Sequence, residues 1–247
     1  MISQSDIIAD LHTHTIFSKH AYSTVQENIT AARNMNLKYL AITDHVYNDG
    51  TKLEIKNEST RFKYFEKEIN SNFDEHKIYI FGGAEFNIAQ RLDHWNKLKK
   101  LTWRPIGLHG FNLDIKEVTL EQLYKGFESA AKLHNAFAHI ERELHKIDNR
   151  RYGLELDTDL KSFFSEIVTL AKQHNVFLEV NESSLRNDEA DYIQKVKFWL
   201  QLAKAKNCYI YLGSDAHYSS RVGKFPLSID LINDLDYPKN LILNIIL

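Results

Sequence analysis

Cysteine and proline are scarce in this chain. Of its 247 residues, one is cysteine (Cys208) and three are proline. A single cysteine excludes a disulfide within the chain and gives no thiolate metal site, which fits a reducing cytoplasm. None of the prolines marks an interdomain linker, and α/β barrels of this length commonly form one domain. We therefore expect a single domain over residues 1–247.

The chain also lacks an excess of charge of either sign and any long apolar run. Its 31 Lys and Arg residues nearly balance its 33 Asp and Glu residues, so the formal net charge is −2. Nothing in this balance recruits nucleic acid or an anionic membrane. No segment approaches the roughly 20 apolar residues of a membrane span, and the N-terminus has neither the basic nor the apolar part of a signal peptide. We expect a cytoplasmic protein without a membrane partner.

Two segments with histidine and aspartate follow directly on short apolar runs. They are Asp10–His14 (DLHTH) and Gly213–His217 (GSDAH). The apolar runs before them are typical of buried strands, and alternate residues of a strand face the same side. His12 and His14 should therefore point the same way, and two imidazoles on one side of a strand can hold a metal ion.

Side chains that can ligate a metal recur beyond other apolar runs. Seven of the twelve histidines lie at or just beyond the end of a predicted strand: His12, His14, His20, His45, His109, His139 and His217. Glu85 has the same kind of position after residues 78–84. In an alternating strand–helix fold the carboxyl ends of the strands converge on one face, where such folds keep their active sites. We expect these side chains to meet there.

Segments with helical periodicity separate the apolar runs. They cover residues 25–36, 120–133, 159–174 and 190–206. Short apolar strands that alternate with such helices predict parallel strands covered by helices. Residues 48–74 are polar and charged, and we expect a loop and an exposed helix that could overhang the site. We expect structural or surface roles for the remaining histidines, which are His76, His94, His134, His145 and His174.

These motifs together resemble the PHP family of metal-dependent phosphoesterases. The resemblance rests, in the family's order, on residues 10–45, Glu85, His109, His139, Leu178–Asn181 and Gly213–His217. It implies a distorted barrel of seven strand–helix units, with a cluster of up to three divalent metals at the carboxyl ends of the strands. Zinc, manganese and iron suit a donor set of imidazoles with a few carboxylates and no sulfur better than calcium or magnesium does.

The resemblance also implies a ligand set. One metal would be held by His12, His14, Glu85 and Asp215, a second by Glu85, His109 and His139, and a third by His20, His45 and His217. Glu85 would bridge the first two metals. Catalytic roles fall to Glu85, Asp215 and His217, while Asp10 and Asp44 either orient neighbouring histidines or make ordinary hydrogen bonds at strand ends.

Such a cluster predicts hydrolysis of a small phosphorylated substrate. Two metals about 3.5–4 Å apart can share a hydroxide and hold the phosphoryl oxygens under attack. Arginines suit phosphate because the guanidinium matches its oxygens. Arg186 and Arg221 lie in segments similar to those of histidinol phosphatases in this family, and Arg142 is a third candidate. The leading hypothesis is a phosphatase of small phosphate monoesters that acts through a metal-bridging hydroxide.

Several other functions stay open at this point. The first is a phosphatase specific for histidinol phosphate. Another is a PHP exonuclease or phosphodiesterase, against which the near-neutral charge counts. An amidohydrolase-type hydrolase also begins with a His-x-His pair, but it would leave His20 and His217 unexplained. A metal-stabilised scaffold without catalysis is the last alternative.

Overall fold

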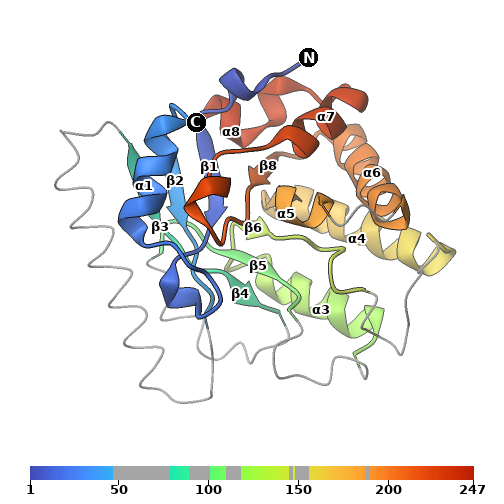
Figure 1. Ribbon diagram of the computed structural model, residues 1–247. Helices are drawn as coiled ribbons and strands as arrows, with labels where there is room; N and C mark the ends of the chain where they lie inside the picture. The colour runs from blue at the N-terminus through green and yellow to red at the C-terminus, as the bar shows by residue number, and fades with distance from the viewer. Residues whose placement is uncertain (47–77, 89–100, 110–117, 145–146, 148–155, 187–189) are drawn as a thin grey trace.

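The structure of the protein, a computed structural model, is an α/β fold in which parallel strands alternate with helices (Figure 1). It describes residues 1–46, 78–88, 101–109, 118–144, 147, 156–186 and 190–247. Within these ranges, no helix is both long and apolar enough to cross a membrane. The loop and helix predicted for residues 48–74 lie outside the described residues, as do His76, His94 and His145.

Three strands form the first sheet. They are β1 (Ala9–Thr13), β2 (Tyr39–Ile42) and β3 (Tyr79–Gly82), in that order, and each neighbouring pair is parallel. Every residue of β1 is buried, as expected for a parallel strand that is covered on both faces. The helix α1 (Val25–Asn34) connects β1 to β2 and lies beside these strands in Figure 1.

Five strands form the second sheet, again with parallel neighbours. In order they are β4 (Phe86–Asn87), β5 (Pro105–Gly107), β6 (Ala136–Phe137), β7 (Phe177–Asn181) and β8 (Ile210–Gly213). Isolated bridges join the two sheets, one between Thr13 and Ala216 and another between Gly83 and Trp103. The first of these brings the carboxyl ends of β1 and β8 side by side.

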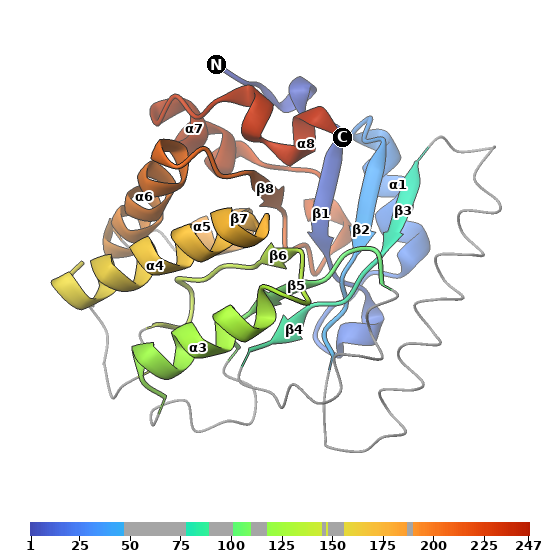
Figure 2. The ribbon, with the colours of Figure 1, turned by 180° about the vertical axis from the view of Figure 1, so that it is seen from behind.

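Helices pack along the second sheet. Both views show α3 (Leu120–Ala130), α4 (Thr158–His174) and α6 (Ala190–Ala205) as one layer beside it (Figures 1 and 2), and α4 contacts the other two. Buried apolar residues of α4 recur every three or four positions, which turns one face of the helix towards the core. Three further helices are α5 (Glu182–Leu185), α7 (Pro226–Asp234) and α8 (Leu243–Ile246).

The four predicted helices are confirmed, with small shifts at their ends. Thr24 starts α1 through a capping box: Glu27 N–H donates to Thr24 Oγ1 at 3.2 Å, and Thr24 N–H donates to Glu27 Oε2 at 2.7 Å. The helix ends at Asn34, two residues earlier than predicted. Asn36 has a φ of 57°, a left-handed conformation that stops the helical hydrogen-bond ladder.

The first strand contains a buried carboxylate. β1 begins at Ala9, inside the apolar run Ile7–Ala9, and continues through Asp10 and His12 to Thr13. The Asp10 carboxylate can lie inside the strand because it accepts hydrogen bonds from the backbone N–H groups of Ser214 at 3.1 Å and Gly223 at 2.8 Å. A buried polar side chain that is satisfied in this way does not end a strand.

His134 is a buried structural histidine, as predicted. Its Nδ1 lies 3.1 Å from the carbonyl oxygen of Arg104, and its ring packs edge-on against Phe86. Burial lowers the pKa of His134 to about 3. The unfolded chain gains a proton here near pH 6.5, while the folded protein does not, so stability is lost as the pH falls from about 6.5 towards 3.

We predict that His134→Gln flattens the pH dependence of stability. Between pH 7 and 5 the wild-type protein should lose about 2 kcal/mol more unfolding free energy than the variant, because His134 alone contributes that difference. Urea unfolding of both proteins, each with excess chelator, measures it. His174→Gln, at the exposed end of α4, is the control and should follow the wild type. Parallel curves for wild type and His134→Gln would contradict the argument.

Candidate metal centre

A buried carboxylate stands at the centre of the predicted cluster. Glu85, which lies between β3 and β4, is 1% exposed. Its Oε1 is 2.7 Å from His139 Nε2 and 3.0 Å from His109 Nε2, and its Oε2 is 2.9 Å from His45 Nδ1, 3.3 Å from His12 Nε2 and 3.4 Å from His14 Nε2. His12 and His14 come from the end of β1, and His45, His109 and His139 follow β2, β5 and β6. The parallel sheets therefore gather them around one charge, as predicted.

Asp215 closes the other side of the His12–His14 pair. Its Oδ1 lies 3.1 Å from His14 Nε2 and 3.8 Å from His12 Nε2. The backbone N–H of Asp215 donates to the carbonyl oxygen of His12 at 2.8 Å. The link between β1 and the segment after β8 therefore places this carboxylate beside the two imidazoles.

Two further imidazoles, His20 and His217, stack next to this group. His20 lies between His45 and His217, with ring centroids 4.9 Å and 4.6 Å away, and His217 packs 4.5 Å from His14. His217 Nδ1 is 3.0 Å from the carbonyl oxygen of Asp215 and must donate to it, so Nε2 keeps its lone pair. The structure thus brings together all nine residues of the predicted ligand set.

Hydrogen bonds behind His12 and His14 determine which ring nitrogen faces the cluster as an acceptor. His12 Nδ1 donates to Glu179 Oε1 at 2.6 Å. Ser18 Oγ donates to Asp44 at 2.5 Å and so accepts from His14 Nδ1 at 3.1 Å. When both rings are neutral, both Nε2 atoms carry lone pairs, as metal-ligating histidines require.

The two Nε2 atoms lie only 3.0 Å apart, and they repel each other unless something positive lies between them. A proton on His12 Nε2 can supply this positive charge. Burial lowers the pKa of His12, but the negative charges of Glu179 and Glu85 have the larger effect and raise this pKa well above its ordinary value. Burial and the neighbouring His45 lower the pKa of His14 well below its ordinary value. A divalent cation would take the place of that proton.

Two further features of the cluster are suited to metal binding: a buried carboxylate oxygen without a hydrogen bond, and ligand atoms that lie close together. Glu85 Oε2 is buried without a hydrogen bond among the residues that the structure describes, although three imidazoles surround it. Ligand atoms lie within 4.8 Å of one another in three groups, which are His12, His14 and Asp215; His45, Glu85 and His109; and His14, His45 and His217. The groups overlap with the three sets implied by the family resemblance but divide the histidines differently. The donor set suits divalent metals of the zinc, manganese and iron type.

Glu179 supports the cluster from behind, although sequence reasoning gave it no role. Besides His12, it holds the backbone N–H of His139 at 3.0 Å and the side-chain amide of Asn181 at 3.2 Å, both through Oε2. Gly213 makes room for it, since a Cβ there would lie 2.0 Å from Glu179 Oε1. An acidic residue between the apolar residues Leu178 and Val180 of β7 was the available signal.

The two aspartates that precede ligand histidines act differently from each other. Asp44 holds the Ser18 hydroxyl and the backbone N–H and hydroxyl of Thr15, and it therefore orients His14 indirectly. Asp10 instead binds backbone N–H groups, as described for β1. Burial raises the pKa of Asp10 to about 6.

Two of the cluster residues have strained backbones. His139 has a φ of 27° and Asp215 a φ of 51°, in the region that residues with a side chain rarely adopt. Strain of this kind persists only where surrounding contacts impose it, and it collects at functional sites. Here the contacts are the hydrogen bonds of Glu179 to His139 and of Asp215 to β1.

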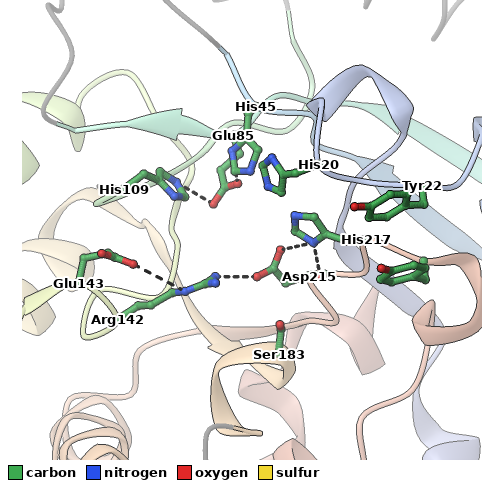
Figure 3. Close-up of a pocket in the computed structure, with 11 residues that line it drawn as sticks. His20, Tyr22, His45, Glu85, His109, Arg142, Glu143, Ser183, Asp215 and His217 are labelled. Atoms are coloured by element: carbon green, nitrogen blue, oxygen red, sulfur yellow. Dashed lines mark hydrogen bonds and ion pairs between the residues drawn. The ribbon is translucent and has the colours of Figure 1, made fainter. Parts of the chain in front are cut away.

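A pocket of about 490 Å³ opens onto the cluster (Figure 3). Its lining consists of His20, Tyr22, His45, Glu85, His109, Arg142, Glu143, Ser183, Asp215, His217 and Tyr218. Arg142 Nη1 donates to Asp215 Oδ2 at 2.9 Å, which sets a guanidinium beside the predicted ligands.

The other two candidate arginines do not line this pocket. Arg186 lies 3.6 Å from Glu182 and Arg221 is exposed, so their contact with phosphate stays a prediction. The cationic side chain at the pocket is Arg142, the third candidate. Its position three residues after His139 was the signal for it. Tyr22 lies within residues 10–45, which carry the family resemblance, and Tyr218 directly follows the predicted ligand His217, but neither tyrosine was assigned a role.

The sequence profile of the PHP domain family matches residues 10–214. The chain belongs to the PHP domain family. A probable phosphatase of Clostridium acetobutylicum is 30% identical over 244 residues, which cover 96% of this chain and 90% of that protein. One of Vibrio parahaemolyticus is 29% identical over 247 residues, with 96% and 89% covered.

The fold of this PHP domain is also that of a solved structure. The histidinol phosphate phosphatase of Lactococcus lactis, complexed with zinc, L-histidinol and phosphate, matches it with a TM-score of 0.66 at 17% identity. The match covers 93% of this chain and 94% of that one.

We predict that His14→Ala and Glu179→Gln both lower the metal content of this PHP domain, to different degrees. His14→Ala removes a nitrogen that faces both Asp215 and Glu85, so bound metal should be lost. Glu179→Gln keeps every ligand but weakens the hydrogen bond that orients His12, and metal affinity should fall about 10- to 100-fold. Titration with Zn²⁺ and Mn²⁺ by calorimetry measures both.

Glu166→Gln is the matched control, because Glu166 is exposed on α4 and lies outside the cluster. It should bind metal as the wild type does. Wild-type affinity in the His14→Ala protein would remove His14 from the ligand set.

Proposed function

We propose that this protein is a metal-dependent phosphatase that hydrolyses small phosphate monoesters. The observation that carries the proposal is the buried Glu85 carboxylate between the nitrogens of five histidines, with Asp215 beside them. The probable phosphatases that cover almost the whole chain support the same class of reaction. We further propose that the two bridged sheets form the distorted barrel of seven strand–helix units, within a single domain.

The residues that would hold the metals are those of the predicted set. They are His12, His14, His20, His45, Glu85, His109, His139, Asp215 and His217. When bound, up to three divalent metals supply a water of lowered pKa and neutralise charge on the phosphoryl group. Glu85 offers one oxygen to His109 and His139 and the other to His12, His14 and His45, a position suited to bridging two metals.

Arg142 would hold a phosphate oxygen that does not react. Its side chain is 35% exposed and lines the pocket, while Asp215 Oδ2 anchors one end of the guanidinium. Glu143 Oε1 lies 4.0 Å from Arg142 Nε. A guanidinium carries five N–H donors in a planar fork that matches the oxygens of a phosphate. Asp215 Oδ1 faces His14, and Asp215 Oδ2 faces Arg142. The same carboxylate therefore positions both a proposed metal ligand and the arginine that would hold the phosphate.

The positions of His20 and His217 count against an amidohydrolase-type centre with fewer metals. Both rings stack with the cluster and line the pocket. A smaller centre would give these two imidazoles no ligand role, whereas a third metal would use both.

We predict that the metal-loaded protein releases inorganic phosphate from small monoesters. A suitable panel, with Mn²⁺ or Zn²⁺, contains histidinol phosphate, ribose 5-phosphate, nucleoside monophosphates, bis(4-nitrophenyl) phosphate and a dipeptide amide. Turnover of several monoesters, and none of the diester or the amide, is the expected result. Turnover of histidinol phosphate alone would narrow the function to that substrate.

Release from the diester, or cleavage of the amide, with no monoester turnover would overturn the proposal in favour of a phosphodiesterase or an amidohydrolase. Bound metal without turnover of any compound would favour a scaffold. Bound metal is measured in the same samples, so a preparation that is inactive because it lacks metal is not mistaken for a scaffold without catalysis.

We predict that Arg142→Gln raises the KM for a monoester about 10-fold or more, since a charged hydrogen bond to phosphate is lost. Metal content is measured alongside, because Arg142 also contacts Asp215. Arg186→Gln and Arg221→Gln are the comparison variants. If KM rises for one of these variants and not for Arg142→Gln, the phosphate contact is made by Arg186 or Arg221, as first predicted, and not by Arg142.

A further inference from the structure

Two tyrosines form an exposed stacked pair at the edge of the pocket. The rings of Tyr22 and Tyr218 lie 4.9 Å apart with an angle of 14° between their planes. Both line the pocket, and they are 67% and 53% exposed. Large aromatic side chains that stay in solvent at a binding pocket are available to a ligand.

Backbone contacts hold the two tyrosines in place. Tyr22 N–H donates to the carbonyl oxygen of His217 at 2.8 Å, and Ser219 N–H donates to Ser23 Oγ at 2.5 Å. Ala21 and Ser23, on either side of Tyr22, are buried. The pair therefore stands on two segments that are tied to each other and to a predicted metal ligand, and little ordering is needed on binding.

The pocket has a charged side and an aromatic side. Figure 3 shows Arg142 and Glu143 on one side, Tyr22 on the other, and Asp215 and His217 between them. Among the described residues that line the pocket, the aromatic rings other than imidazoles are Tyr22 and Tyr218. A phosphate held by the metals and Arg142 would therefore direct an apolar or aromatic alcohol towards the tyrosines and away from the charged Glu143 carboxylate. The alcohol then extends over the tyrosines.

We propose that Tyr22 and Tyr218 form an aromatic platform that selects phosphate monoesters whose alcohol carries a planar aromatic ring. This inference rests on the proposed phosphatase function and adds a substrate class to it. Stacking on an aromatic side chain tolerates many rings because each has a π face. The platform acts on binding and not on the chemical step, so its effect appears in KM.

Adenosine 5′-monophosphate and ribose 5-phosphate test the platform. Both place the phosphate on the same primary alcohol of ribose, and they differ by the adenine ring. The wild-type enzyme, loaded with Mn²⁺, should have a kcat/KM about 10-fold or more higher for the nucleotide. In Tyr218→Ala and in Tyr22→Ala this ratio should fall towards one, mainly because the KM for the nucleotide rises, and Tyr218→Phe should keep the ratio.

Tyr79→Ala is the matched control. Tyr79 is also 53% exposed and also stacks on a tyrosine, Tyr39, at 5.7 Å, but it does not line the pocket. The ratio of kcat/KM for adenosine 5′-monophosphate to that for ribose 5-phosphate should be the same in Tyr79→Ala as in the wild type. A wild-type ratio near one, or a ratio that both alanine variants leave unchanged, would overturn the platform and leave the proposed phosphatase function standing.

A binding measurement separates the two proposals. Calorimetric titration of the metal-loaded protein with adenosine, which has no phosphate, requires no turnover. Binding that Tyr218→Ala weakens about 10-fold and Tyr218→Phe retains supports the platform even for a protein that hydrolyses no monoester. Adenosine that binds no better than ribose would overturn it.

Discussion

The charge of Glu85 is the constraint on which the site depends. Burial alone would raise the pKa of this carboxyl, yet the surrounding His109, His12 and His45 hold it well below its ordinary value. A buried ionised carboxylate is costly unless cations or hydrogen bonds compensate it. The imidazoles can do so by donating an N–H hydrogen bond, by taking up a proton or by sharing metals with it. Metal binding would stabilise this charge only in the folded site, so metal loading and folding are coupled.

Parallel strands bring these side chains together at one end of the sheets and leave the rest of each strand free to be mostly apolar. The strands are largely apolar along their buried length, and most side chains of the cluster lie at a strand end or just after it, whereas Asp10 and Glu179 lie within β1 and β7. The backbone then satisfies much of the remaining polarity: Asp10 binds the N–H groups of Ser214 and Gly223, and Glu179 binds that of His139. Glu179 also accepts a hydrogen bond from His12 Nδ1 and so fixes the direction in which that imidazole points.

The ligand cluster could be predicted from the sequence because it follows from local position. His45 and His109 each follow an apolar run, and parallel strands align such ends whatever the remaining fold. The role of Glu179 depends on the distance between β7 and β1, and that of Arg142 on the unusual φ of His139, which turns the chain back to Asp215. Neither the distance between β7 and β1 nor the backbone turn at His139 can be predicted from the residue pattern of a single segment. The bridges that join the sheets likewise depend on packing of distant segments.

One short segment after β8 connects the chemistry of the site to its selectivity. The left-handed φ of Asp215 breaks the alternation of the strand, so that Asp215 faces His14 and Arg142 while His217 stacks on His20. Tyr218 follows at once and faces solvent beside Tyr22. His217 and Tyr218 are adjacent in sequence, but the His217 ring faces the cluster and the Tyr218 ring faces solvent. A substitution at Tyr218 can therefore change which alcohol is accepted without moving His217, the proposed metal ligand.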